Sequence, residues 1–289
     1  MTRYRVRHVT TYSYDQAVDL GRHMLHLTPR ALPWQAVVAA SLLADPVPTR
    51  RDDGVDHFGN PVTWMALDQA HARFRLSLDA VVEVMHPAPP AGEATWGWER
   101  VAAAARDGLG WEAAEFAFGS PMAPADAGAG AYAAVSFPAG RPVLAGLLEL
   151  MGRIRREFAF KPGVTTISTP VARVLAQRAG VCQDFTHLMI AGLRALGLPA
   201  RYVSGYLRTR PPPGQAARQG ADQSHAWVGA WLGPEHGWVD LDPTNNLVVC
   251  DEHVVLAWGR DYGDISPVRG IILGGGSHAL TVAVDLAPV

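Results

Sequence analysis

The first third of the chain carries the alternation of apolar and polar residues that is typical of β-strands. Residues 3–14 (RYRVRHVTTYSY) alternate with a period of two, and residues 74–85 (FRLSLDAVVEVM) are rich in β-forming residues. Turn-forming residues fill positions 56–60 (DHFGN) between them. We therefore predict an antiparallel sheet or sandwich over residues 1–90, ended by a proline-rich linker at 86–92.

Helical periodicity replaces this alternation beyond residue 141. Pro142 can occupy a first helical turn, and apolar residues then recur at helical spacing: Leu144, Leu147, Leu148, Met151, Ile154 and Phe158. Residues 91–140, before this point, are rich in alanine and glycine and show weak periodicity. We expect them to form an irregular linker with one helix near residues 96–106.

Two more helices are expected further along the chain. Thr169 and Pro170 have the pattern of an N-cap followed by a first helical residue, and Gly180 would end that helix. The other helix would begin near Cys182 and end at Gly197, a glycine suited to the left-handed position after a helix.

Strands return after this last helix. The strand-like segments are 200–207, 225–232, 237–242 and 279–286, and a loop rich in Pro, Gly and Gln occupies 209–222. Helices followed by antiparallel strands indicate an α+β class rather than a doubly wound parallel sheet. Residues 141–289 are accordingly predicted to form one unit, separate from the amino-terminal β-rich domain.

Composition narrows the classes of protein that this chain can belong to. Of its 289 residues, 48% are hydrophobic and 18% are charged, which suits a folded core and not a disordered chain. The net charge of −2 and the lack of a basic tract argue against a nucleic-acid partner. No apolar run reaches the ~18 residues of a membrane span, and the amino terminus lacks the apolar stretch of a secretory signal. We expect a cytoplasmic protein without a membrane partner.

The chain has two cysteines, Cys182 and Cys250. Two cysteines are too few for a disulfide framework or a four-thiolate zinc site, and both are expected to be reduced. Cys250 lies in the apolar run LVVC and is predicted to be a small buried residue. Cys182 begins a predicted helix, where free N–H groups and the positive end of the helix dipole favour a nucleophilic thiolate.

A histidine and an aspartate follow in the two predicted strands on either side of a short loop, 233–237 (GPEHG). Pairing of these strands in a hairpin brings His225 close to Asp242. A carboxylate beside an imidazole fixes its tautomer and supports its cation, and the imidazole can hold a thiolate as an ion pair. Asp240 lies on the same face as Asp242 and is the rival for this position if the register slips.

The segments 180–207 (GVCQDFTHLMIAGLRALGLPARYVSGYL), 224–228 (SHAWV) and 237–246 (GWVDLDPTNN) resemble the bacterial transglutaminase-like superfamily of cysteine enzymes. Residues 1–90 also resemble the β-rich region that precedes this core in a bacterial subgroup, and 261–270 (DYGDISPVRG) are typical of that subgroup. The resemblance implies a papain-like, transglutaminase-like core, with helices packed on an antiparallel sheet and a sandwich-like amino-terminal domain. It assigns the nucleophile, histidine and acidic residue to Cys182, His225 and Asp242.

Other residues are given structural interpretations. Asp184 is expected to cap the start of the helix. Gln183 is a candidate to contact the oxyanion or the substrate. His187 is expected to pack against neighbouring residues or to face solvent. The histidines His236 and His253 lack the spacing of a zinc site, so neither a metal nor another cofactor is expected. Three tryptophans are expected to wall the cleft and pack the sheet: Trp227, Trp231 and Trp238.

The resemblance favours a peptidase or amidase that acts on a peptide or protein amide through a thioester. A protein-glutamine transamidase would use the same steps up to the final acceptor, so the Cys–His–Asp set does not separate the two. A binding or assembly module that retains the three residues is a third hypothesis. The oligomeric state, the substrate and the second oxyanion donor are left open by the sequence.

Overall fold

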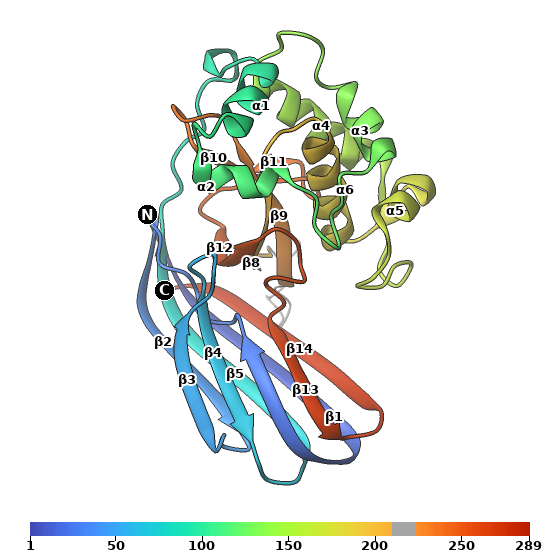
Figure 1. Ribbon diagram of the computed structural model, residues 1–289. Coiled ribbons are helices and arrows are strands. Elements are labelled where there is room, and N and C mark those ends of the chain that lie inside the picture. Colours follow the sequence, from blue (N-terminus) through green and yellow to red (C-terminus); the bar gives the residue numbers. More distant parts are fainter. Residues whose placement is uncertain (210–222) are drawn as a thin grey trace, which may run out of the picture.

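The computed structural model describes residues 1–209 and 223–289, so the predicted loop at 209–222 lies outside the described residues except for Thr209. Helices and a five-stranded sheet form one half of the molecule, and a seven-stranded sheet forms the other (Figure 1). No helix among the described residues has the length and apolar character needed to cross a membrane.

The seven-stranded sheet is built around one long strand, β1. Along residues 2–13 β1 pairs with β5, with a register shift between Ser13 and Val18, and along 21–25 it pairs with β4. Five of the seven strands have the order β2-β5-β1-β4-β3, and the other two also pair with β1. The strands are β1 (Thr2–Leu25), β2 (Gln35–Asp45), β3 (Arg50–Val55), β4 (Pro61–Leu67) and β5 (His71–Val84).

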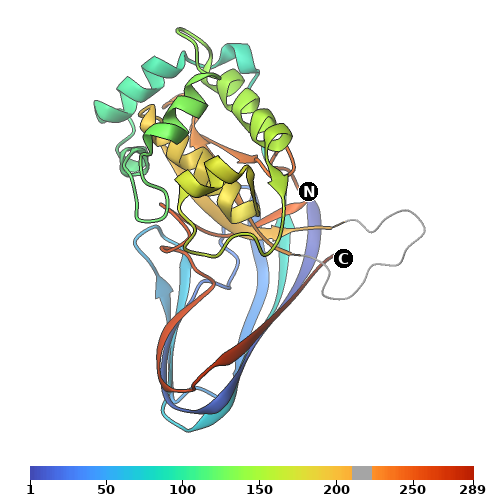
Figure 2. The same cartoon turned by 90° about the vertical axis from the view of Figure 1, so that its right-hand side faces the viewer.

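The carboxy-terminal strands β13 (Val268–Gly274) and β14 (His278–Pro288) also belong to this sheet, because each pairs antiparallel with β1. The predicted unit of residues 141–289 is therefore wrong in its last segment. Alternating residues of β14 explain the placement: Val284 and Leu286 are buried in the same apolar cluster as Tyr4 and Val6. Figure 2 shows β1 and β14 running side by side along the length of this half.

The helical half contains the helices expected from periodicity, but the prediction of an irregular linker with one helix over residues 91–140 is wrong, because this stretch forms several helices whose apolar residues pack into the core. The helix predicted near 96–106 is present as α1, the helix after Pro142 as α4, and the helix from Cys182 as α6, with Gly197 left-handed at φ 77°. The helices are η1 (Gly92–Ala94), α1 (Trp98–Arg106), α2 (Trp111–Ala114), η2 (Glu115–Ala117), α3 (Ala127–Ala134), α4 (Val143–Glu157), α5 (Val171–Gln177) and α6 (Cys182–Ala195).

The boundaries of α5 differ from the prediction. Pro170 is its N-cap rather than its first residue, and Arg178, left-handed at φ 52°, ends the helix before Gly180. Gly180 instead lies in β7 (Ala179–Gly180), which pairs with β6 (Ala159–Phe160). A Cβ at Gly180 would lie 2.6 Å from Asp184 Oδ2, so a glycine is required by close packing at this point and not by a helix end.

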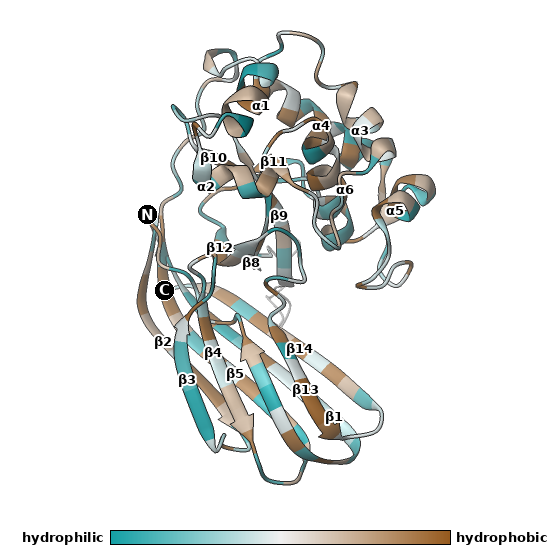
Figure 3. Cartoon of the chain, in the orientation of Figure 1, coloured by the Kyte–Doolittle hydropathy of each residue, from teal (hydrophilic) through white to brown (hydrophobic). Residues whose placement is uncertain are grey.

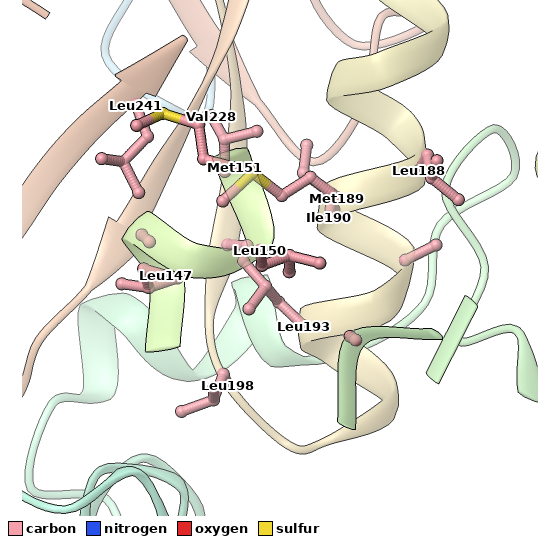
Figure 4. Close-up of a cluster of buried hydrophobic side chains, with 14 of the residues drawn as sticks. Leu147, Leu150, Met151, Leu188, Met189, Ile190, Leu193, Leu198, Val228 and Leu241 are labelled. Atoms are coloured by element: carbon pink, nitrogen blue, oxygen red, sulfur yellow. The ribbon is translucent and has the colours of Figure 1, made fainter. Parts of the chain in front are cut away.

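The five-stranded sheet has the order β11-β10-β9-β8-β12. Its strands are β8 (Ala200–Leu207), β9 (Gln223–Trp231), β10 (Trp238–Asp242), β11 (Leu247–Val248) and β12 (His253–Gly259). Helix α6 is buried along most of its length, and apolar residues of α4 and α6 pack there against Val228 and Leu241 of the sheet (Figure 4). This packing holds the first residue of α6, Cys182, against the sheet.

The two halves share one interface. Tyr206, Val254 and Leu256 come from the five-stranded sheet but lie in the apolar cluster of the seven-stranded sheet. In Figure 3 the strands of that larger sheet alternate between hydrophilic and hydrophobic residues, as the sequence pattern predicts for strands with one buried face.

Candidate active site

Cys182 is the first residue of α6, and its side chain is half-buried. The Asp184 carboxylate accepts the Val181 N–H at 2.7 Å and the Thr165 hydroxyl at 2.7 Å, which agrees with the predicted capping role. Burial raises the pKa of Asp184 despite these two hydrogen bonds. The N–H groups of a first helical turn have no acceptor within the helix, so the thiol lies where a negative charge is stabilised.

The β9–β10 hairpin brings His225 and Asp242 together. The register pairs Leu241 with Val228 and Asp240 with Gly229, and the imidazole Nε2 of His225 donates to Asp242 Oδ2 at 2.8 Å. The Cys182 thiol raises the pKa of the same imidazole, and both side chains line one cavity. The structure thus brings together the three residues that the sequence singled out.

The Asp242 carboxylate is fully buried but well supplied with donors. Its Oδ1 accepts the backbone N–H groups of Thr244 at 2.9 Å and Asn245 at 3.2 Å, while its Oδ2 also accepts the Asn245 side-chain amide at 2.7 Å. Burial raises the pKa of Asp242, but the hydrogen bonds from His225 and Asn245 and the nearby His253 imidazole outweigh that effect and lower it. Asp242 is therefore an anion held in place for the imidazole.

The environment of His225 favours its cation. Burial lowers the pKa of His225, but the hydrogen bonds to Asp242 and Cys182 act in the opposite direction and raise it to about 10. An imidazolium between a carboxylate and a thiol can deliver a proton to a leaving group.

Asp240, the rival carboxylate, does not contact His225. It accepts the indole N–H of Trp227 at 3.1 Å and lies 3.7 Å from the guanidinium of Arg201. Of the other candidates, Gln183 donates its side-chain amide to Ile167 O at 3.1 Å. His187 is buried, where burial lowers its pKa to about 4, and its Nε2 accepts the Tyr262 N–H at 3.2 Å, which makes it a packing residue.

Sequence reasoning missed two partners of Asp242. Asn245 stands within the GWVDLDPTNN segment, and its side chain also lies 3.4 Å from His225 Nε2. His253 on β12 is fully buried with its Nε2 3.6 Å from Asp242 Oδ2. An asparagine shortly after an aspartate at a strand end is a recognisable turn signal, whereas nothing local to β12 indicates that His253 faces Asp242.

Cys250 is exposed, so the prediction of a buried residue is wrong. Its sulfur lies 3.9 Å from Nδ1 of His253, and this hydrogen bond lowers the pKa of Cys250. The apolar run LVVC ends at the loop between β11 and β12, where burial of Val249 does not extend to its neighbour.

Ligand-type atoms of His225, Asp242 and His253 lie within 4.8 Å of one another. Asp242 Oδ2 already accepts hydrogen bonds from His225 and Asn245, so an ion bound there would displace both. The cluster therefore fits a network of imidazoles on one carboxylate better than a metal centre.

A cavity of about 570 Å³ opens beside Cys182 and His225. It lies between the two halves of the molecule, because its lining also includes Tyr12 of β1 and Leu280 of β14. The three tryptophans expected to wall the cleft are not among the lining residues: Trp227, Trp231 and Trp238 pack inside the protein or on its helical side.

Comparisons with known proteins agree with this architecture. Residues 4–83 match the family described as the bacterial transglutaminase-like N-terminal region, and residues 138–243 match the transglutaminase-like superfamily. An uncharacterized protein of Mycobacterium tuberculosis is 41% identical over 295 residues, which cover 99% of this chain and 93% of that protein. A protein-glutamine gamma-glutamyltransferase of Pseudomonas aeruginosa is 33% identical over 103 residues, which cover 35% of this chain and 15% of that protein.

A solved structure has the same overall fold. A proposed cysteine protease from Cytophaga hutchinsonii superposes with a TM-score of 0.77 and 22% identity, covering 100% of this chain and 91% of that one. The α+β class, the papain-like core and the accompanying β-rich region predicted from the sequence are thereby confirmed. The chain belongs to the bacterial transglutaminase-like superfamily, in the form that carries the transglutaminase-like N-terminal region before the core.

Proposed function

We propose that the protein is a cysteine-dependent acyl-transfer enzyme that hydrolyses amide bonds, with Cys182 as nucleophile, His225 as acid and base, and Asp242 as the residue that orients His225. One observation carries this proposal: the Cys182 thiol and the His225 imidazole line the same cavity, and that imidazole hydrogen-bonds with the buried Asp242 carboxylate. Family membership supports cysteine-based acyl transfer as the class of reaction.

The reaction proceeds in two steps. In the first, the Cys182 thiolate attacks the amide carbonyl, the C–N bond breaks, and the His225 imidazolium gives its proton to the leaving amine. In the second, water attacks the thioester carbonyl and gives a proton to His225, and the C–S bond breaks. The carboxylic acid is released, and the Cys182 thiolate and His225 imidazolium are restored. The N–H groups at the start of α6 are placed to donate to the oxyanion of each step.

Transamidation is the second candidate, and the relative named as a protein-glutamine gamma-glutamyltransferase favours it. An amine would then replace water in the second step, with the same residues in the same roles. We prefer hydrolysis because the structural neighbour that covers the whole chain is a proposed cysteine protease. The preference for one acceptor over another rests on these relatives alone.

A peptide library incubated with the purified protein tests both candidates. With and without a primary amine, mass spectrometry measures cleaved peptides and amine-modified glutamines. Hydrolysis in excess of amine incorporation is the expected result, and the reverse would replace the peptidase by the transamidase.

Labelling with iodoacetamide tests whether the protein is an enzyme of this kind at all. Peptide mapping measures the labelling of each cysteine over time. Cys182 is expected to react faster than Cys250. Equal and slow labelling of both thiols would favour a binding module that retains the three residues.

A further inference from the structure

The cavity beside Cys182 has two walls of different origin. One is the candidate catalytic wall, with Cys182 and Gln183 of α6 and His225 of β9. The other comes from the seven-stranded sheet, where β14 contributes Leu280, Val282 and Val284. These three residues have a spacing of two, so they lie on one face of the strand. The opposite wall of the candidate active site is therefore an aliphatic stripe.

This stripe is available to a ligand at its open end. Leu280 is 51% exposed and Val282 is 50% exposed, whereas Val284, deeper along the strand, is buried. When an apolar group covers exposed aliphatic side chains in a cavity, water is displaced from both surfaces, and the free energy of binding becomes more favourable.

The position of the stripe is fixed by strand pairing. β14 pairs with β1 without interruption from Tyr4–Pro288 to Tyr14–His278. Sites on paired strands are held more accurately than sites on loops. The sheet that precedes the core in the sequence thus presents β14 to the catalytic residues at a defined position.

The described lining of the cavity contains no Asp, Glu, Lys or Arg side chain. His8, at the floor, is buried and already hydrogen-bonds with the Tyr206 hydroxyl and the Thr10 hydroxyl, each at 2.7 Å. Burial lowers the pKa of His8 to about 4, so this imidazole is neutral near pH 7. Apart from the reacting Cys182–His225 pair, the described lining offers no opposite charge to a charged substrate side chain that loses water here.

We propose that the β14 stripe of Leu280, Val282 and Val284 is the specificity surface of the enzyme, and that it selects substrates with an uncharged, aliphatic side chain on the acyl side of the scissile amide. This inference rests on the proposed function, since it takes Cys182 as the nucleophile. It gives the seven-stranded sheet a direct part in choosing the substrate. Contact with one aliphatic group separates good from poor substrates by about 10- to 200-fold in such pockets.

The test measures alkylation of Cys182 by peptidyl acyloxymethyl ketones in a Cys250→Ala background, which leaves one thiol. The probes are identical except for Leu, Asp or Lys next to the reactive ketone. Intact-mass spectrometry gives the second-order rate constant for each probe, and iodoacetamide, which has no such side chain, measures the intrinsic reactivity of the thiol. The Leu probe is expected to react at least about tenfold faster than the Asp and Lys probes.

Two variants and a matched control locate the selectivity. Leu280→Ser combined with Val282→Thr should reduce the ratio of Leu to Asp rates at least about fivefold, and Leu280→Arg should shift the preference toward the Asp probe. Leu273→Ser alters a leucine of the same sheet that is 64% exposed and does not line the cavity, so it should leave the ratio unchanged. The iodoacetamide rate of each variant measures the remaining reactivity of its Cys182 thiol, and a general change in that reactivity cancels from the ratio of Leu to Asp rates.

The possible failures are distinguishable. Rapid iodoacetamide labelling of Cys182 with equal rates for the three probes would overturn the specificity surface and leave the proposed function standing. An unchanged Leu preference in the β14 variants would also overturn it. Slow labelling of Cys182 by iodoacetamide and by every probe would overturn the nucleophile, and the specificity surface with it.

Discussion

Two cysteines of this protein lie beside histidines, and both histidines face the same carboxylate. Cys182 lines a cavity together with His225, and Cys250 lies 3.9 Å from His253 Nδ1. His225 and His253 approach Asp242 Oδ2 to 2.8 Å and 3.6 Å. Judged by thiol, imidazole and carboxylate alone, the two sets are close to equivalent.

Their surroundings are not equivalent. Cys182 begins α6 and lines a cavity of about 570 Å³, whereas Cys250 is exposed before β12 and does not line that cavity. The first set therefore has helix-start N–H groups for an oxyanion and a place for a substrate, and the second lacks this combination. A reactive thiol becomes a catalytic one through what surrounds it.

The largest difference is expected from the thiols themselves. Cys182→Ala removes the nucleophile and should reduce turnover of a peptide substrate by at least about 10⁴-fold, while Cys250→Ala should change it by less than about twofold. Steady-state kinetics on the same substrate check both values. Comparable losses of turnover in the two variants would contradict the assignment of Cys182 as the catalytic cysteine.

The histidines come next. His225→Ala removes the group that protonates the leaving amine and should reduce kcat by about 10²- to 10⁴-fold. His253→Gln keeps a polar group near Asp242 and should cost less than about tenfold. Thermal unfolding of each variant, measured alongside, separates chemistry from folding. A greater loss in kcat for His253→Gln, in a folded variant, would assign the catalytic part to the second set.

The shared carboxylate should have a smaller effect. Asp242→Asn weakens the orientation and charge support of His225 and should reduce kcat by about 10- to 100-fold. Asp240→Asn, its matched control on the same strand, should cost less than about threefold, because Asp240 contacts Trp227 and Arg201 instead.

Combining Cys182→Ala with Asp242→Asn should be no worse than Cys182→Ala alone, since the residues act as a unit. If Asp240→Asn were the more damaging variant, the orienting carboxylate would be Asp240.

The smallest effect concerns stability and pH. The pKa of His225 is raised to about 10 by the folded state, so the stability it contributes is fully present below its ordinary value near 6.5 and is lost as the pH rises through about 10. The wild type should therefore exceed His225→Gln in free energy of unfolding by about 1–3 kcal/mol more at pH 6 than at pH 10. Urea unfolding at the two pH values measures this. A difference that grows toward pH 10 would show that the imidazole is neutral in the folded protein.

Local signals explain what the sequence predicted correctly. The helix start at Cys182, the left-handed Gly197 and the short loop of the β9–β10 hairpin each depend on neighbours a few residues away. The His225–Asp242 contact follows from that hairpin, because alternation and loop length set its register.

The errors concern contacts between distant segments. The alternation in β14 predicts a strand, but a strand's own pattern does not specify its partner, and β1 lies more than 260 residues away in the pairing of Tyr14 with His278. The burial of His253 and the exposure of Cys250 likewise depend on how β12 packs against β8 and beside Asp242. A sequence read one segment at a time does not contain that information.

The pairing of β14 with β1 also sets an order of events during translation. The ribosome adds β14 after Cys182, His225 and Asp242, although β14 supplies a wall of the cavity beside them. While β14 is still in the exit tunnel, a nascent chain can already contain the complete thiol, imidazole and carboxylate set but not the surface opposite it. The cavity is consequently enclosed only when β14 joins β1, after the residues of that set have been synthesised.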